Sequence, residues 1–357
     1  MLISIVWKQL FQATWKTFRS RFGPLIANLR RHKHLVENQA GLAQFEETQK
    51  LRLQAESEFR RIREAEDLRR RSEVLEWLSP ANFEDDQEMR SLPRGKYPNV
   101  CSWILKEKSV RAWMNRSTTH RKPLLWINGI PGSGVSSSLL CCATTLPTNH
   151  ALGKSTIASF LVEELRKTST TPTLFFYCKH EDKERNSFPA LARALMQQAV
   201  CKSDDLLSFV YEEAAICGEK PLKSAARAEK VLDLALKSLG PVYIIIDGLD
   251  ECDLSEIPRI SSWFIKYIHE ETQLGNSDTR CLILSQDDKV THRLFKLVPQ
   301  ISITEGDLAG DIKSFCKVEG SELKRKFGLA QSECDGIINL VADEAHGKRR
   351  SIKDKMQ

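Results

Sequence analysis

A phosphate-binding loop is present in this sequence, but in two pieces. Residues 123–134 read PLLWINGIPGSG and residues 153–161 read GKSTIASFL. When Val135–Gly153 is left out, the text becomes GIPGSGKST, which satisfies the pattern G-x-x-x-x-G-K-[ST]. An apolar run precedes the joined loop and an amphipathic helical pattern follows it, as the motif requires. This arrangement is typical of a loop that wraps the phosphates of a nucleotide.

Each residue type in the joined loop has a chemical task. Glycines let the backbone approach phosphates without Cβ clashes, and consecutive N–H groups at a helix N-terminus attract an anion. Lys154 would reach the β- and γ-phosphates, and the Ser155 hydroxyl would bind Mg²⁺. The predicted nucleotide-binding residues are Gly129, Gly132, Gly134, Gly153, Lys154, Ser155 and Thr156.

The stretch between the two pieces breaks the motif. In the sequence as given, with this stretch included, Thr148 stands five residues before Gly153, at the position where the motif requires a glycine. Val135–Gly153 is rich in Ser, Thr, Cys and Leu and shows no periodicity. We interpret it as a retained intron that stays in frame; the alternative is a real surface loop, whose closure entropy would be small. Sequencing of the transcript across this junction distinguishes the two.

A second group of charged residues follows a later apolar run. Residues 242–251 read VYIIIDGLDE. A buried strand that ends in Asp247 places this carboxylate at the C-terminal edge of a parallel sheet, where open α/β folds bind ligands. We expect Asp247 to hold Mg²⁺, mostly through water. Glu251 or Asp250 would orient or deprotonate the water that attacks the γ-phosphate.

Apolar runs alternate with helical patterns in the second half of the chain. This alternation predicts an α/β fold: a parallel sheet flanked by helices, as in P-loop NTPases, preceded by an all-α N-terminal region. The run at 280–285 is predicted to lie between the two motif strands, with Ser285 and Gln286 either sensing the γ-phosphate or simply ending the strand. Strands are expected at 124–128, 173–178, 242–246, 280–285 and 300–304, with helices at 156–167, 188–200, 206–217, 222–239, 257–269 and 290–297.

Four segments are expected along the chain. Residues 1–78 form a helical domain with a break at Gly23–Pro24, and 79–120 form a linker with a short helix. Residues 121–306 form the nucleotide-binding core, and 307–357 a helical extension that is cut short. Apolar residues in 1–28 recur at helical spacing, which favours packing in a bundle over lying on a membrane. A coiled coil further along remains open.

Composition limits the class of protein. Hydrophobic residues make up 41% and charged residues 28%, as in soluble globular proteins. The net charge of +6 comes from residues 1–75, and we read it as a solvated helix face; nucleic acid is an unlikely partner. The ten cysteines form no C-x-x-C pair, which favours a reducing, cytoplasmic location. No apolar run is long enough for a transmembrane helix.

Both motifs together resemble the NACHT type of P-loop NTPase in the STAND class, and most closely the nephrocystin-like N-terminal NTPase domain of fungal NLR-like receptors. The resemblance rests on LLWINGIPGSG with KST, on YIIIDGLDEC, on CLILSQDD and on INLVADEAHG. It covers about residues 103–347. It implies an ATP- or GTP-binding switch, with ATP favoured, that needs Mg²⁺, hydrolyses slowly if at all, and forms homo-oligomers in the triphosphate state.

The chain departs from that family pattern in two places. The family has no insertion before the lysine, and its members continue into a winged-helix region and sensor repeats, whereas no repeat of 20–50 residues is found here. A competing hypothesis is therefore a scaffold that has lost nucleotide binding and makes protein contacts through its helical N-terminus. A membrane- or nucleic-acid-binding role for that N-terminus is a third hypothesis.

Overall fold

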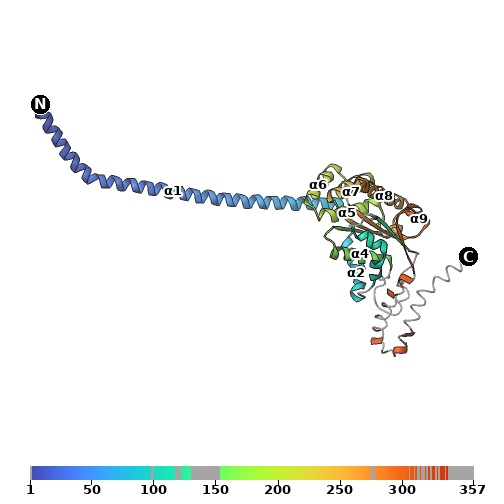
Figure 1. Cartoon of the computed structure of the whole chain (residues 1–357). Coiled ribbons are helices and arrows are strands. Elements are labelled where there is room, and N and C mark those ends of the chain that lie inside the picture. Colours follow the sequence, from blue (N-terminus) through green and yellow to red (C-terminus); the bar gives the residue numbers. More distant parts are fainter. Residues whose placement is uncertain are drawn as a thin grey trace. The chain divides into compact units, whose positions relative to one another are not determined.

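The computed structural model describes residues 2–97, 100–116, 122–129, 153–274 and 278–304, and single positions from there to 336. The chain divides into two compact units, Met1–Arg69 and Arg70–Gln357 (Figure 1). Most of the helical extension expected at 307–357 lies outside the described residues. Among the residues that are described, no helix is long and apolar enough to cross a membrane.

Helix α1, Leu2–Leu78, forms the described part of the first unit. Its last residues, 70–78, belong to the second unit. The break that we predicted at Gly23–Pro24 is wrong, because Pro24 lies inside the helix. A proline removes one backbone hydrogen bond, but the rest of the ladder can continue through the neighbouring leucine and alanine residues, which favour helix.

The part of α1 that lies in the first unit exposes both its polar and its apolar described side chains to solvent. Ion pairs one turn apart, such as Arg52 and Glu56 at 3.1 Å, support the helix at its surface. The apolar side chains that we expected in a bundle wall are not buried, since Val6 is 51% and Leu25 56% exposed. Within the described part of this unit, α1 therefore packs against no second helix.

The second unit is built around a five-stranded sheet with the order β2-β3-β4-β1-β5, in which every pair is parallel. All five predicted strands are confirmed to within two residues. The strand expected between the two motif strands is also confirmed, because β4 pairs with both β1 and β3. The strands are β1 Leu124–Gly129, β2 Thr173–Tyr177, β3 Tyr243–Asp247, β4 Arg280–Gln286 and β5 Gln300–Ile303.

Helices cover both faces of the sheet. Figure 1 shows α2 and α4 on one face and α5, α7, α8 and α9 on the other. A short 3₁₀ helix, Ser102–Lys106, precedes α3, and another, Leu249–Glu251, follows β3. The helices are α2 Phe83–Lys96, α3 Lys108–Met114, α4 Lys154–Thr168, α5 Phe188–Val200, α6 Asp204–Cys217, α7 Ala225–Leu239, α8 Glu256–Leu274 and α9 Lys289–Phe295.

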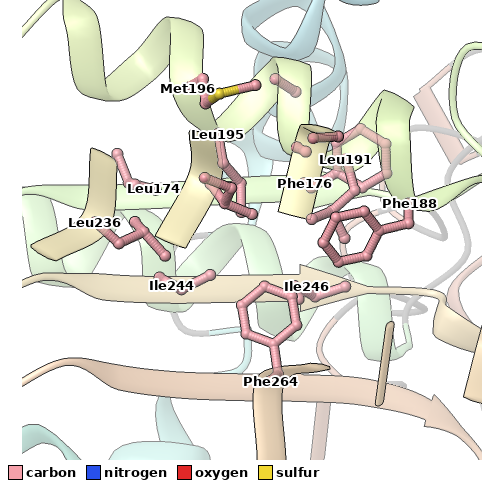
Figure 2. Packing of buried hydrophobic residues seen from close by; sticks show 14 of the residues in the cluster. Leu174, Phe176, Phe188, Leu191, Leu195, Met196, Leu236, Ile244, Ile246 and Phe264 are labelled. Carbon is pink, nitrogen blue, oxygen red and sulfur yellow. The ribbon is translucent and has the colours of Figure 1, made fainter. Parts of the chain in front are cut away.

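The two faces of the sheet bury separate hydrophobic clusters. Successive strand residues point to opposite faces, so Ile244 and Ile246 pack with helices α5, α7 and α8 (Figure 2). On the other face, Ile245 packs with Ile157 and Leu161 of α4. Because both faces are covered, the ends of the strands remain as the place for polar chemistry.

The segment expected to be a linker contains a helix that packs on the sheet. The Asn82 side chain accepts a hydrogen bond from Asp85 N at 3.3 Å at the start of α2, and three acidic residues in the first turn suit the helix dipole. The ring of Phe83 then contacts Phe175 of β2, with centroids 5.7 Å apart. The sequence analysis predicts a linker here because proline, glycine and clustered acidic residues are typical of linkers. The same acidic residues are also typical of the first turn of a helix.

The buried cluster on the α5 side gives a first test. Leu195 of α5 is fully buried, whereas Leu297, after α9, is 95% exposed. We expect Leu195→Ala to lower the free energy of unfolding by about 2–5 kcal/mol, and Leu297→Ala to change it by less than about 0.5 kcal/mol. Urea unfolding of both variants measures this. Equal losses would show that α5 does not pack as described.

Candidate functional site

The C-terminal edge of the sheet brings the two motif segments together. The register pairs Gly129 at the end of β1 with Gln286 of β4, and Asp247 at the end of β3 with Leu284 of the same strand. Tyr177, the last residue of β2, is paired with Asp247 on its other side. The parallel arrangement therefore aligns the end of β1, which precedes the split loop, with the acidic end of β3.

Helix α4 begins at the second piece of the split loop. Gly153 is its N-cap, and Lys154, Ser155 and Thr156 form its first turn. The carbonyl of Gly153 accepts hydrogen bonds from the amides of Thr156 and Ile157, both at 3.1 Å. The structure thus places a strand end and a helix start where the motif needs them. Gly132 and Gly134 of the predicted set lie outside the described residues.

Asp247 is a buried acid at this edge. Its side chain is 2% exposed. Burial raises its pKa from 3.8 to about 6, while a hydrogen bond from Ser155 and the charges of Arg90 and Lys154 act in the opposite direction. Its Oδ1 atom has no hydrogen-bond partner among the described residues. An unpartnered buried carboxylate oxygen is costly, so this atom is poised to accept a ligand.

The atoms near Asp247 fit a hard cation. The Ser155 hydroxyl and the free Asp247 oxygen are oxygen donors, which Mg²⁺ prefers, and Mg²⁺ typically takes one or two protein carboxylates with water and phosphate. Over the described ranges, no group of three or more His, Cys, Asp or Glu side chains could hold a metal by itself. Ser155 and Asp247 would therefore hold the ion together with non-protein ligands.

The two other acids of the second motif are fixed by backbone amides. Asp250 Oδ1 accepts a hydrogen bond from Gln286 N at 2.8 Å, which joins the ends of β3 and β4. Glu251 Oε2 accepts one from His180 N at 3.2 Å. Burial raises the pKa of Glu251, although this amide lowers it. Glu251 is thus the better placed proton acceptor, because the role of Asp250 in joining the strands accounts for its position.

A glycine permits the tight turn that carries these acids. Gly248 has φ +72°, and a Cβ atom there would lie 3.2 Å from the carbonyl of Cys178. Its amide donates to Leu284 O at 3.0 Å. Any other residue would be strained at this position.

Ser285, near the polar end of β4, forms hydrogen bonds inside the core. The Ser285 hydroxyl is fully buried, accepts a hydrogen bond from Trp126 Nε1 at 2.8 Å and donates to Gln286 O at 3.0 Å. These bonds favour our second interpretation of Ser285, as the polar end of a strand.

One residue near the site was missed by the sequence analysis. The guanidinium of Arg90, on α2, lies 4.1 Å from the centroid of the Tyr177 ring. Its charge lowers the pKa of both Asp247 and Glu251. No signal in the sequence could have assigned it, because α2 lies far from both motifs along the chain.

These features define a parallel α/β protein with a polar site at the C-terminal edge of its sheet, formed by α4, β3 and α2. Comparison with protein families agrees with this class. The profile described as "Nephrocystin 3, N-terminal" matches residues 99–145 and 136–286, which together make up more than half of the chain. The chain belongs to this family. The two matched segments overlap at residues 136–145, which lie inside the insertion. Comparison with the curated proteins found no match.

The buried acid predicts an unusual dependence of stability on pH. Because folding raises the pKa of Asp247 from 3.8 to about 6, this carboxyl group favours the folded state most below about pH 4, and that contribution is lost as the pH rises through 6. We expect Asp247→Asn, without Mg²⁺, to raise the free energy of unfolding by up to about 3 kcal/mol at pH 8. Little gain is expected at pH 4.

Urea unfolding in chelator at both pH values measures this difference. Asp205→Asn is the control, since Asp205 is exposed at the start of α6, and it should change stability similarly at both pH values. A gain at Asp247 that does not depend on pH would contradict the description of a buried, ionising carboxyl group.

Proposed function

We propose that the chain binds a nucleoside triphosphate with Mg²⁺ and acts as a nucleotide-gated switch of the NACHT type, as in fungal STAND signalling proteins. This proposal is carried by the buried carboxyl group of Asp247, whose pKa is raised by burial and lowered by a hydrogen bond from Ser155. One residue starts the helix after the split loop, the other ends β3, and Oδ1 of the buried acid has no hydrogen-bond partner in the part of the chain that the structure describes. A motif hydroxyl and a motif carboxylate side by side are what a magnesium–phosphate site requires.

Each residue then has one role. Lys154 binds the β- and γ-phosphates, with the backbone of Gly129, Gly132, Gly134, Gly153 and Thr156 around them. Ser155 and Asp247 hold Mg²⁺, which bridges the phosphates and neutralises their charge. Glu251, or less directly Asp250, orients the attacking water. ATP is favoured over GTP as the ligand, on the resemblance alone. Slow turnover, homo-oligomers in the triphosphate state and protein partners at α1 belong to the same proposal.

The insertion supports a second candidate function. If Val135–Gly153 is translated, it separates the glycines from Lys154, and a phosphate would lose the continuous loop of amides around it. The chain would then be a scaffold that keeps the fold without binding nucleotide. The family match, which is broken within this stretch, supports the view that the insertion is foreign to the domain.

Binding measurements on two proteins separate these functions. We expect the chain without Val135–Gly153 to bind a fluorescent ATP analogue in the presence of Mg²⁺. The full chain should bind it at least about a hundredfold more weakly, which is a loss of about 2.7 kcal/mol in binding free energy. Lys154→Ala should abolish binding. Lys167→Ala is the matched control, because Lys167 lies exposed in the last turn of the same helix.

Each result decides between the alternatives. Equal binding by both proteins would show that the insertion is tolerated and that our account of the loop is wrong. If neither protein binds, the scaffold function takes the place of the switch.

Hydrolysis gives a separate test of Glu251. We expect Glu251→Gln to lower turnover of ATP by about a hundredfold or more, since general base catalysis contributes about 10²–10⁴, and to leave ATP binding unchanged. Phosphate release under saturating ATP measures this. Unchanged turnover in Glu251→Gln together with a loss in Asp250→Asn would reverse the roles of the two acids.

A further inference from the structure

Arg90 brings a positive charge from α2 to the acidic edge of the sheet. Its guanidinium is 4.1 Å from the centroid of the Tyr177 ring. Tyr177 is paired in register with Asp247, and in a sheet such neighbours point to the same face. This is the face covered by α4, because Tyr177 belongs to the same cluster as Ile157. The guanidinium therefore lies on the side of the sheet where Ser155 meets Asp247.

The charge of Arg90 acts on both acids of the site. It lowers the pKa of Asp247 and of Glu251, against the effect of burial in each case. Yet among the described residues its only ion pair is with Asp86, on its own helix. In the described part of the chain, Arg90 therefore forms an ion pair with neither acid, and the position of its guanidinium is given by the Tyr177 ring and by Asp86.

The Arg90 side chain is held in place from one side. Its Nη1 atom donates to the carbonyl of Asp86 at 3.1 Å and to the carboxylate at 3.3 Å. Asp86 is itself held by Arg185, whose Nε donates to it at 2.8 Å. A guanidinium has five N–H donors, and the Arg90 side chain remains 24% exposed. Donors therefore remain for an anion that arrives from solvent.

The helix that carries Arg90 is anchored to the first turns of α4. Arg94 donates to Thr156 O at 3.3 Å and to the Ser159 hydroxyl at 3.0 Å. Gln87 donates to the same hydroxyl at 3.1 Å and accepts a hydrogen bond from the Tyr177 hydroxyl. These buried bonds fix α2 relative to the start of the phosphate-loop helix, so Arg90 needs no large movement to meet a ligand there.

We propose that Arg90 contacts the terminal phosphate of the bound nucleoside triphosphate, so that α2 distinguishes a triphosphate from a diphosphate. The inference rests on the proposed function and deepens it. A guanidinium supplied within the same chain can stabilise charge on a γ-phosphate, and its planar fork suits phosphate oxygens. Since only four residues lie between the end of α1 and the start of α2, the phosphate state of the nucleotide would act directly on the segment that follows α1.

The chain offers a matched control for Arg90. Arg166 of α4 also stacks on an aromatic residue of β2, 4.9 Å from the centroid of Phe175. It also pairs with an acid of α2, since its Nη2 lies 2.8 Å from Glu84 Oε1. It therefore stabilises the same interface of α2 with the sheet, but two residues further from the C-terminal edge along β2.

Titration calorimetry with a non-hydrolysable ATP analogue and with ADP, both with Mg²⁺, tests the proposal. The full chain and the chain without Val135–Gly153 are titrated first, and the variants are made in whichever binds. We expect Arg90→Gln to weaken binding of the ATP analogue at least about tenfold, or by about 1.4 kcal/mol, and to change ADP binding less than about twofold. Arg166→Gln should leave the ratio of the two affinities unchanged.

The outcomes separate this inference from the proposed function. If both nucleotides bind and Arg90→Gln weakens them equally, or weakens neither, the contact with the terminal phosphate is excluded while nucleotide binding stands. If no nucleotide binds to either parent protein, both proposals fall. Should Arg90→Gln not fold, Arg90→Lys, which keeps the charge, must still lower the ratio of the two affinities, and an unchanged ratio would overturn the inference.

Discussion

Burial of the Asp247 carboxyl group shapes the whole C-terminal edge of the sheet. A carboxylate that is removed from water needs compensation, and here it comes from three residues of two segments that are distant in the chain: Lys154 and Ser155 at the start of α4, and Arg90 on α2. One carboxylate oxygen has no hydrogen-bond partner within the described ranges. This edge of the sheet therefore holds a carboxyl group with a raised pKa, close to a hydroxyl group and to positive charges. Groups with perturbed pKa values are common at functional sites.

Helix α2 connects this electrostatic arrangement with the rest of the second unit. Its buried polar side chains, Gln87 and Arg94, donate hydrogen bonds to the Ser159 hydroxyl and to backbone carbonyls of α4. Such bonds fix one arrangement of the helix, because leaving any of these groups unpaired would cost free energy. Position and charge are thus supplied by the same helix, on residues one turn apart.

Helix α4 packs on the sheet through residues that lie after the split loop. α4 is held by Ile157, Ala158 and Leu161, which are fully buried against the sheet, and these lie after the insertion. A longer connection between β1 and α4 adds little closure entropy. Under the proposed function, the insertion would change the backbone next to the phosphates, so its consequence would fall on nucleotide binding and not on the sheet.

Local pattern in the sequence was enough to predict the five strands and the order of β1, β4 and β3, because apolar runs and motif spacing are short-range signals. It failed where the deciding interaction is long-range or cumulative: Pro24 does not end α1, and the expected linker forms α2. The position of Arg90 and the binding of Asp250 to β4 were decided by tertiary structure alone. Neither leaves a trace in local spacing, since each depends on segments that meet only when the sheet and its helices pack.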